Sequence, residues 1–242
     1  MATPREAIDT LTRKLQRIAQ LSPSDLDRLY KLPIRMERVP RSRLLVREGK
    51  QPEHCCLLVS GFAARYKEAA NGLRQIVSFH LSGDLLDIQH LLLEKADHSV
   101  EAITDAEIGW VPKSELIDLA MERPAIGKAL WRDSLIDGSI FREWVLNVGR
   151  RDGKTRIAHM LCEFVARCEA AGLGAAEGFV LPMTQEQIAD AVGLTAVHVN
   201  RCLRALDGDR VVVRNGAQFR VIDWHRLSTI GDFDPAYLHS AA

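Results

Sequence analysis

The stretch that decides the fold is Met183–Leu206, with the sequence MTQEQIADAVGLTAVHVNRCLRAL. Thr184 is suited to cap a first helix, and Gln187, three residues later, completes a capping box. Gly193 permits the positive φ of a sharp turn, because it has no Cβ atom. Thr195 is suited to cap a second helix directly after that turn. The stretch therefore predicts a helix-turn-helix.

The apolar residues of this stretch fall where two crossing helices bury their side chains. Ala189 is small where the helices must cross, and Val199 lies on the inner face of the second helix. The other inward-facing residues are Ile188, Val192, Leu194, Cys202, Leu203 and Leu206. An ordinary helical hairpin is the alternative interpretation, but it does not require all of these positions together.

The outer face of the second helix has polar residues that its core does not need. In a helix-turn-helix this helix enters the major groove, and its N-terminal part contacts base edges. Arg201 can bind O6 and N7 of guanine, Asn200 can pair with adenine or hold a phosphate, and Val197 can contact a thymine methyl group. The predicted DNA-binding residues are Gln185, Thr195, Val197, His198, Asn200, Arg201 and Arg204. The alternative for each is a solvent-facing helix residue.

The residues after the second helix predict a β-hairpin. Two alternating stretches, 211–214 and 218–222, are separated by Asn215-Gly216, which favours a tight turn. Such a hairpin makes the motif a winged helix-turn-helix. Between residues 195 and 226 there are six arginines and three aspartates, a modest local excess of positive charge for phosphate contacts.

The chain upstream divides into segments of different periodicity. Residues 4–32 have a helical rhythm, with a fresh N-cap at Ser22. Between residues 33 and 112, short apolar runs are broken by Gly, Pro, Asn and Asp, which indicates an antiparallel sandwich or roll. Asn71-Gly72 favours a hairpin turn within this region.

A long helix is predicted from Pro124 to about Val148. It is apolar over a wide arc, so it must be buried on two sides. The preceding β unit can cover one side, and the same helix of a second subunit is the economical cover for the other. The predicted dimer residues are Leu130, Ile136, Ile140, Phe141, Trp144 and Val148. A hinge at residues 149–153 and a further helix over 154–171 are expected to follow.

Composition places limits on the class of protein. The 242 residues are 47% apolar and 26% charged, with 32 basic and 32 acidic residues, so a basic surface must be local. No run of ~18 apolar residues predicts a membrane-spanning helix. The N-terminus lacks the apolar core of a signal peptide, so we expect a cytoplasmic protein without a membrane partner. The five cysteines include no C-x-x-C pair, which predicts buried, reduced thiols rather than a metal site. No nucleophile–base pair or phosphate-binding loop indicates an enzyme, so no catalytic residue is expected.

The order of these segments resembles the Crp/Fnr family of bacterial transcription regulators, named for the cyclic-AMP receptor protein. The resemblance covers nearly the full chain. It rests on LLVREG at 44–49, LLVSGFAARY at 57–66, FHLSGDLL at 79–86, KTRIAHMLCEF at 154–164, and the stretch from Leu181 to Leu206.

The resemblance implies an α+β fold in three parts. These are an N-terminal cyclic-nucleotide-binding-like β-roll, or jelly-roll, over 1–123, a dimerisation helix and hinge over 124–150, and a winged helix-turn-helix over 151–242. It implies a homodimer that binds an inverted-repeat site on double-stranded DNA and acts on RNA polymerase. The N-terminal domain would sense an effector.

The identity of that effector can be judged from positions at which this chain differs from the family members that bind cyclic AMP. Members that bind cyclic AMP have Gly-Glu where this chain has Asp87 and Ile88, and Arg-Ser where it has His98 and Ser99. They have a Thr on the long helix at the position of Phe141. A neutral His is a poor substitute for a guanidinium fork. These five residues are the predicted effector pocket, and they argue against cyclic AMP. An unidentified small molecule, or a pocket filled by its own side chains, is the expectation.

The sequence gives little support for the other cofactors that members of this family bind. Iron–sulfur members have an N-terminal cysteine cluster, but residues 1–54 contain no Cys. Histidines of the β region are candidates for haem, although a lone His is more often surface or core. Cys55 and Cys56 alternate across a strand, so at most one faces any pocket. The alternative function is a small-molecule or redox sensor that acts through protein contacts and has a degenerate DNA module.

The recognition helix also departs from the family. Many relatives have a Glu at the position of Val197 and a Ser at the position of Asn200. Glu can accept a hydrogen bond from N4 of cytosine, whereas Val cannot. The sequence therefore predicts a half-site that keeps the guanine read by Arg201 and differs at the neighbouring base pair.

Overall fold

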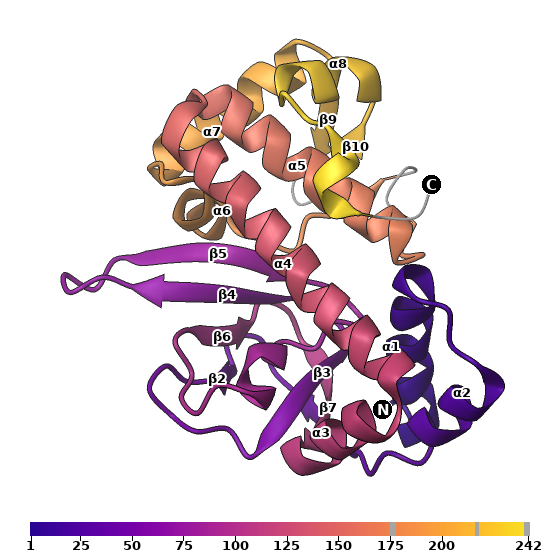
Figure 1. Cartoon of the computed structure of the whole chain (residues 1–242). Helices are drawn as coiled ribbons and strands as arrows, with labels where there is room; N and C mark the ends of the chain where they lie inside the picture. Colours follow the sequence, from indigo (N-terminus) through magenta and orange to yellow (C-terminus); the bar gives the residue numbers. More distant parts are fainter. Residues whose placement is uncertain (175–177, 216–217, 240–242) are drawn as a thin grey trace. The chain divides into compact units, whose positions relative to one another are not determined.

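The computed structural model describes residues 1–174, 178–215 and 218–239. The chain forms two compact units, which are described separately. Unit 1 contains residues 1–66 and 79–138 with His239, and unit 2 contains 67–78 and 139–238. Figure 1 shows the elements in chain order. Among the helices within the described ranges, none combines the length and the apolar character that a bilayer span needs.

Seven strands build the β-roll that the sequence predicts. They are β1 (Arg35–Val39), β2 (Leu44–Val46), β3 (His54–Ser60), β4 (Ala63–Glu68), β5 (Arg74–His80), β6 (Ser99–Ala102) and β7 (Ala106–Pro112). One sheet has the order β1-β7-β3 and the other the order β2-β6-β4-β5. The predicted turn at Asn71-Gly72 joins β4 to β5, and Gly72 has a φ of 81°.

Strand β3 separates two apolar cores. Cys56 and Leu58 face a core that has residues from both sheets, whereas Cys55, Leu57 and Val59 face a core shared with the helices. Five consecutive residues of β3 are buried for this reason. The prediction that Cys55 and Cys56 point to opposite sides of the strand is therefore confirmed.

Helices cover the outer side of the β1-β7-β3 sheet. They are α1 (Pro4–Ile18), α2 (Pro23–Leu29), α3 (Lys113–Glu122) and the first part of α4 (Pro124–Arg150), with the 3-10 turn η1 (Ile88–Leu91) nearby. Thr3 and Ser22 cap α1 and α2 through capping boxes. Lys14 of α1 forms ion pairs of 2.8 Å with Asp84 and with Asp133 of α4. These pairs fix the N-terminal helix to the roll.

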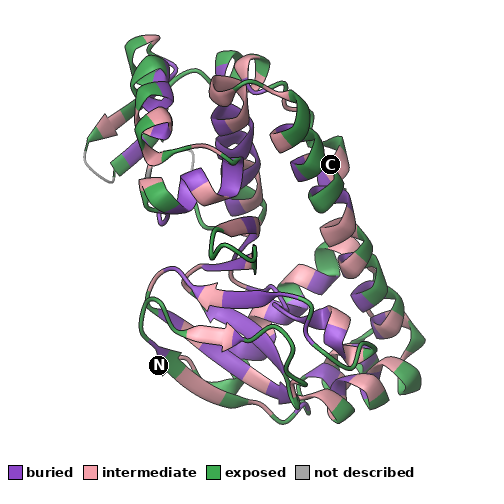
Figure 2. Ribbon diagram, turned by 90° about the vertical axis from the view of Figure 1, so that its left-hand side faces the viewer, coloured by how far each residue is buried: buried purple, intermediate pink, exposed green. Residues whose placement is uncertain are grey.

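Helix α4 is continuous through Gly138, at which unit 1 ends. Figure 2 shows many exposed residues along this helix, and large apolar residues are among them. They are Trp131, Leu135, Phe141, Val145 and Leu146. Three of the predicted dimer residues, Leu130, Ile140 and Trp144, are instead buried within the chain.

Unit 2 is built around helix α5 (Gly153–Ala170), which packs against α6 (Gln185–Val192), α7 (Ala196–Gly208) and α8 (Trp224–Ile230). A three-stranded sheet has the order β8 (Phe179–Val180), β10 (Gln218–Val221), β9 (Val212–Asn215), and η2 (Pro235–Leu238) follows α8. The predicted wing is thus present as β9 and β10. Gly216 of the predicted turn lies outside the described residues.

The predicted break between the long helix and the next one is confirmed. Helix α4 ends at Arg150 and α5 begins at Gly153, with Asp152 as its N-cap. Arg151, in the break, pairs with Glu143 at 2.7 Å and with Asp232 at 2.9 Å. The two ion pairs connect the end of α4 to the segment after α8.

Candidate nucleic-acid interface and effector pocket

Caps and a left-handed glycine fix the turn between α6 and α7. The Thr184 hydroxyl accepts a hydrogen bond from the Gln187 amide at 3.1 Å, and Gln187 Oε1 accepts from the Thr184 amide at 2.9 Å. Gly193 has a φ of 65°, a conformation that a Cβ atom would strain. The Thr195 hydroxyl accepts from the His198 amide and caps α7. The predicted helix-turn-helix is confirmed in these details.

The inner face of this motif is shielded from solvent. Ile188, Ala189 and Val192 of α6 are at most 6% exposed. On α7 the buried residues are Val199, Cys202, Leu203 and Leu206. Burial of this face leaves the opposite side of α7 free to contact another molecule.

Three predicted DNA-binding residues project from that opposite side. Val197 is 81% exposed, and Arg201 and Arg204 are exposed four and seven residues later on the same helical face. Neither guanidinium has a hydrogen bond or ion pair to any residue that the structure describes. Thr195 is also exposed, at the N-terminal end of the helix.

The other three predicted residues have partners inside the unit. Asn200 Nδ2 donates a hydrogen bond to Gln185 Oε1 at 3.0 Å, which links the two helices. His198 is half-buried and lies against the start of α5, because a Cβ atom on Gly153 would come within 2.8 Å of His198 Nε2. These side chains therefore hold α7 in place.

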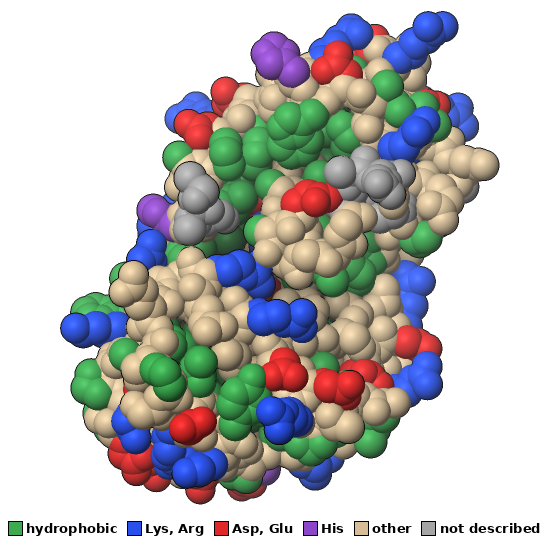
Figure 3. Space-filling view, turned by 90° about the vertical axis from the view of Figure 1, so that its right-hand side faces the viewer, with side chains coloured by type: hydrophobic (Ala, Val, Ile, Leu, Met, Phe, Trp, Pro, Cys, Tyr) green, Lys and Arg blue, Asp and Glu red, His purple; other side chains and the backbone are tan. Residues whose placement is uncertain are grey.

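Local charge around the motif is only moderately positive. Lys154 Nζ lies 2.6 Å from the Asp209 carboxylate, and this contact holds the pKa of Asp209 below its usual value. Lys and Arg side chains are interspersed with Asp and Glu on the face of the molecule shown in Figure 3, as the balanced total of 32 and 32 suggests. Any attraction to DNA is thus confined to a local surface.

In unit 1, four of the five predicted effector-pocket residues are buried. Asp87 accepts hydrogen bonds from Cys56 N at 2.9 Å and Cys55 Sγ at 3.1 Å, and burial raises its pKa. Ile88, His98 and Ser99 are each at most 8% exposed. Phe141 belongs to unit 2, where it is 50% exposed.

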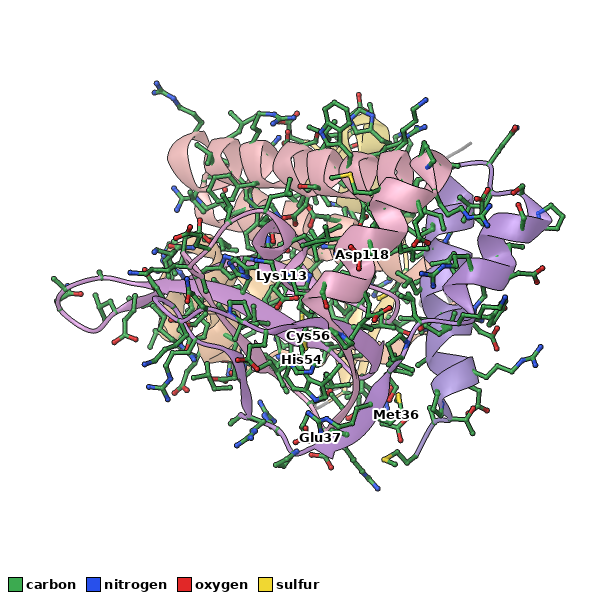
Figure 4. All side chains as sticks on the ribbon, turned by 60° about the horizontal axis from the view of Figure 1, so that its bottom comes forward. Met36, Glu37, His54, Cys56, Lys113 and Asp118 are labelled. Carbon is green, nitrogen blue, oxygen red and sulfur yellow. The ribbon has the colours of Figure 1, made fainter. Side chains whose placement is uncertain are left out.

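The space beside these residues is filled. A hollow lined in part by His54, Cys55 and Asp87 of the roll and by Lys113 at the start of α3 has no room for a water molecule. Figure 4 marks His54 and Cys56 on β3 and Lys113 above them. Nearby, the buried Arg65 donates to Asp137 at 2.6 Å and to the Leu86 carbonyl at 3.0 Å. The predicted pocket residues are thus largely bonded to their own neighbours.

One cluster in this region is visible only in the folded chain. The rings of His90 and His98 stack at 5.2 Å between centroids, and His98 Nδ1 lies 2.7 Å from Asp97 Oδ1. Burial lowers the pKa of both histidines, that of His98 to about 4, and the nearby Arg65 acts in the same direction. Sequence spacing gave no reason to pair residues 90 and 98, because the loop between η1 and β6 brings them together.

The cysteines fit their predicted role as reduced, buried thiols. All five are free and buried. Burial raises the pKa of Cys162 and Cys168 to about 12 and raises those of Cys55 and Cys56 well above the usual value. Because the thiolate is the reactive form, burial in the protonated state disfavours reaction of these four thiols.

Comparison with known proteins finds a matching domain family for each half of the chain. Residues 155–230 match a Crp-like helix-turn-helix domain, and residues 36–123 match a cyclic nucleotide-binding domain. The transcriptional activator protein FnrL of Cereibacter sphaeroides is 28% identical over 183 residues, which are 74% of this chain and 73% of FnrL. The anaerobic regulatory protein of Haemophilus influenzae is 26% identical over 207 residues, 86% of this chain and 80% of that protein. The structure of FixK2 from Bradyrhizobium japonicum is similar with a TM-score of 0.75 and 26% identity, covering 82% of this chain and 98% of FixK2.

Proposed function

This chain belongs to the Crp/Fnr family of DNA-binding transcription regulators, and on that premise we propose that it binds an inverted-repeat DNA site as a homodimer. The observation that supports this best is the exposed face of α7. Val197, Arg201 and Arg204 project there without partners among the described residues, while the opposite face of α7 is buried. A helix-turn-helix that no longer binds DNA would not need two exposed arginines on this face of α7.

Specificity is assigned to a small number of side chains. Arg201 reads a guanine through O6 and N7, and Val197 contacts the neighbouring base pair. Gln185 and Asn200 share one hydrogen bond, so each keeps part of its amide for a base edge or a phosphate. Thr195 and Arg204, with His198 in a supporting position, hold the DNA backbone.

The dimer is assigned to the exposed side of α4. Trp131, Leu135 and Val145 follow a heptad spacing, which is the pattern of two helices that pack side by side. Phe141, Ile136 and Val148, from the predicted interface, remain exposed or half-buried. In a dimer of this kind the two recognition helices reach half-sites ~34 Å apart, one turn of DNA.

The N-terminal roll is assigned the role of sensor for an effector other than cyclic AMP. Four of its five predicted pocket residues are buried, Asp87 is hydrogen-bonded to Cys55 and Cys56, and none of the five supplies a fixed guanidinium for a cyclic phosphate. RNA polymerase, in the cytoplasm, is the expected target of the regulator.

Selection of duplexes from random DNA by the purified protein tests this proposal. Arg201→Ala is the test variant, and Arg38→Ala, which changes an exposed arginine on β1, is the matched control. We expect an enriched inverted repeat with the native chain and with Arg38→Ala. Arg201→Ala should bind that repeat ~1–3 kcal/mol more weakly. Enrichment that Arg201→Ala retains in full would favour the alternative, a sensor that acts through protein contacts.

A further inference from the structure

We propose that His90, Asp97 and His98 form a binding site for a divalent transition-metal ion, with Zn²⁺ as the representative. The site lies in unit 1, where η1 supplies His90 and the loop that leads to β6 supplies Asp97 and His98. It goes beyond DNA recognition and does not depend on it. Two imidazoles and one carboxylate are a donor set that suits Zn²⁺ and similar ions better than Mg²⁺ or Ca²⁺.

The three side chains already lie close enough for one ion. One ligand atom from each lies within 4.8 Å of the others. Ligands of a tetrahedral Zn²⁺ at ~2.0–2.1 Å lie ~3.3 Å from one another. Closing the site therefore requires these atoms to approach one another by about 1.5 Å or less, a shift that side-chain rotations can provide.

Unsatisfied nitrogens point to a missing ligand. His90 is 2% exposed, and neither of its ring nitrogens has a hydrogen-bonding partner in the described structure. His98 is 5% exposed, and its Nε2 also has no partner there. Buried polar atoms are nearly always bonded, and each exception needs a reason. A metal ion would bind a lone pair on each of these two rings.

Asp97 supplies the negative charge of the site. Its carboxylate lies 2.7 Å from His98 Nδ1, and the side chain is 74% exposed. Asp97 is therefore the ligand on the solvent side of the site, and the two imidazoles are the buried ligands. The cations nearby are Arg65 and Lys113, and the charge of Arg65 is balanced by Asp137 at 2.6 Å.

Metal titration of the full-length chain, after treatment with EDTA and dialysis, tests the site. We expect calorimetry with Zn²⁺ to show one ion per chain with micromolar or tighter affinity. Co²⁺ should give the visible absorption of a tetrahedral site without a thiolate charge-transfer band, because the ligands are imidazoles and a carboxylate.

Two variants make the test specific. Asp97→Asn changes an exposed side chain, so it should fold, and it should weaken Zn²⁺ binding at least tenfold. His90→Gln should abolish stoichiometric binding, with circular dichroism as the check on folding. His225→Ala removes an exposed histidine from unit 2 and should leave binding unchanged. Absence of Zn²⁺ binding by the native chain would overturn the proposal, and so would full binding by both Asp97→Asn and His90→Gln or a thiolate band with Co²⁺.

Discussion

Val197 is the residue at which base recognition should differ most from that of many relatives. Its side chain is 81% exposed on the face of α7 that also has Arg201. We expect Val197→Glu to change the preferred base pair next to the guanine toward one that offers cytosine N4, because a carboxylate can accept that hydrogen bond. Parallel selections of random DNA with both proteins measure this. An unchanged half-site would contradict the assignment of Val197, and thermal unfolding should be unaffected.

His80 is one of the buried histidines that should make stability sensitive to mild acid. It is 4% exposed as a side chain, and burial lowers its pKa below the usual value, against the opposing effect of Asp84 at 3.2 Å. The unfolded chain therefore takes up the proton first as the pH falls below about 6.5. We expect the free energy of unfolding to decrease between pH 7.5 and pH 5.5 in urea titrations. His80→Gln should show a smaller decrease over the same range, and an equal decrease would assign the effect to other groups.

Residues with a local role could be predicted from the sequence. Thr184, Gln187 and Gly193 act on neighbours a few positions away, so spacing alone defines their geometry. His90 and Asp97 could not be assigned in this way, because a loop between elements brings their side chains together. The hydrogen bond between Asn200 and Gln185 is an intermediate case, since both residues were predicted for DNA but not as partners.

Close approach of α8 to α5 depends on Gly231. A Cβ atom at this position would lie 2.8 Å from the backbone nitrogen of His159 and 2.9 Å from the carbonyl carbon of Ala158. Backbone atoms cannot move aside as a flexible side chain does, so Gly231→Ala should cost about 1–3 kcal/mol of unfolding free energy. Urea denaturation measures it.

Gly149→Ala is the matched control for that substitution. Gly149 lies in the last turn of α4, and a Cβ atom there would meet nothing within 4 Å. The variant should be neutral or up to ~1 kcal/mol more stable, because Ala favours a helix over Gly. Equal losses for the two glycines would show that the contact between α8 and α5 is not the cause.

Elements with clear periodicity or caps were predictable, whereas short packed ones were not. Helices α1, α5, α6 and α7 and the roll strands followed from repeating apolar positions and N-caps. Helix α3 was not predicted, because Pro112 at its start provides no side-chain cap hydrogen bond. Helix α8 has only 7 residues, too few for a periodic pattern, although Asp223 caps it.

At the scale of the molecule, the sequence did not determine which side of α4 packs against its own chain. A helix that is apolar over a wide arc does not reveal which side its own chain covers. Leu130, Ile140 and Trp144 were assigned to a second subunit, but the chain buries them itself. Trp144 Nε1 also donates to the buried Glu163 carboxylate at 3.0 Å, an intrachain bond that needs both α4 and α5. The exposed side of α4 is therefore the one that contains Trp131, Leu135 and Val145.

If the exposed side of α4 forms the dimer interface, charged substitutions on that side should produce a monomer. Trp131 and Leu135 are 68% and 57% exposed, so replacing both with Glu should leave the fold intact. In a dimer the two helices would bring four carboxylates together, and like charges without partners oppose association. Sedimentation should show a dimer for the native chain and a monomer for the double variant, with loss of binding to the full inverted repeat. Met121→Glu, at an apolar residue of α3 that is 75% exposed, should remain dimeric. A double variant that stays dimeric would place the interface elsewhere, because four unpaired carboxylates facing one another would oppose association along this side of α4.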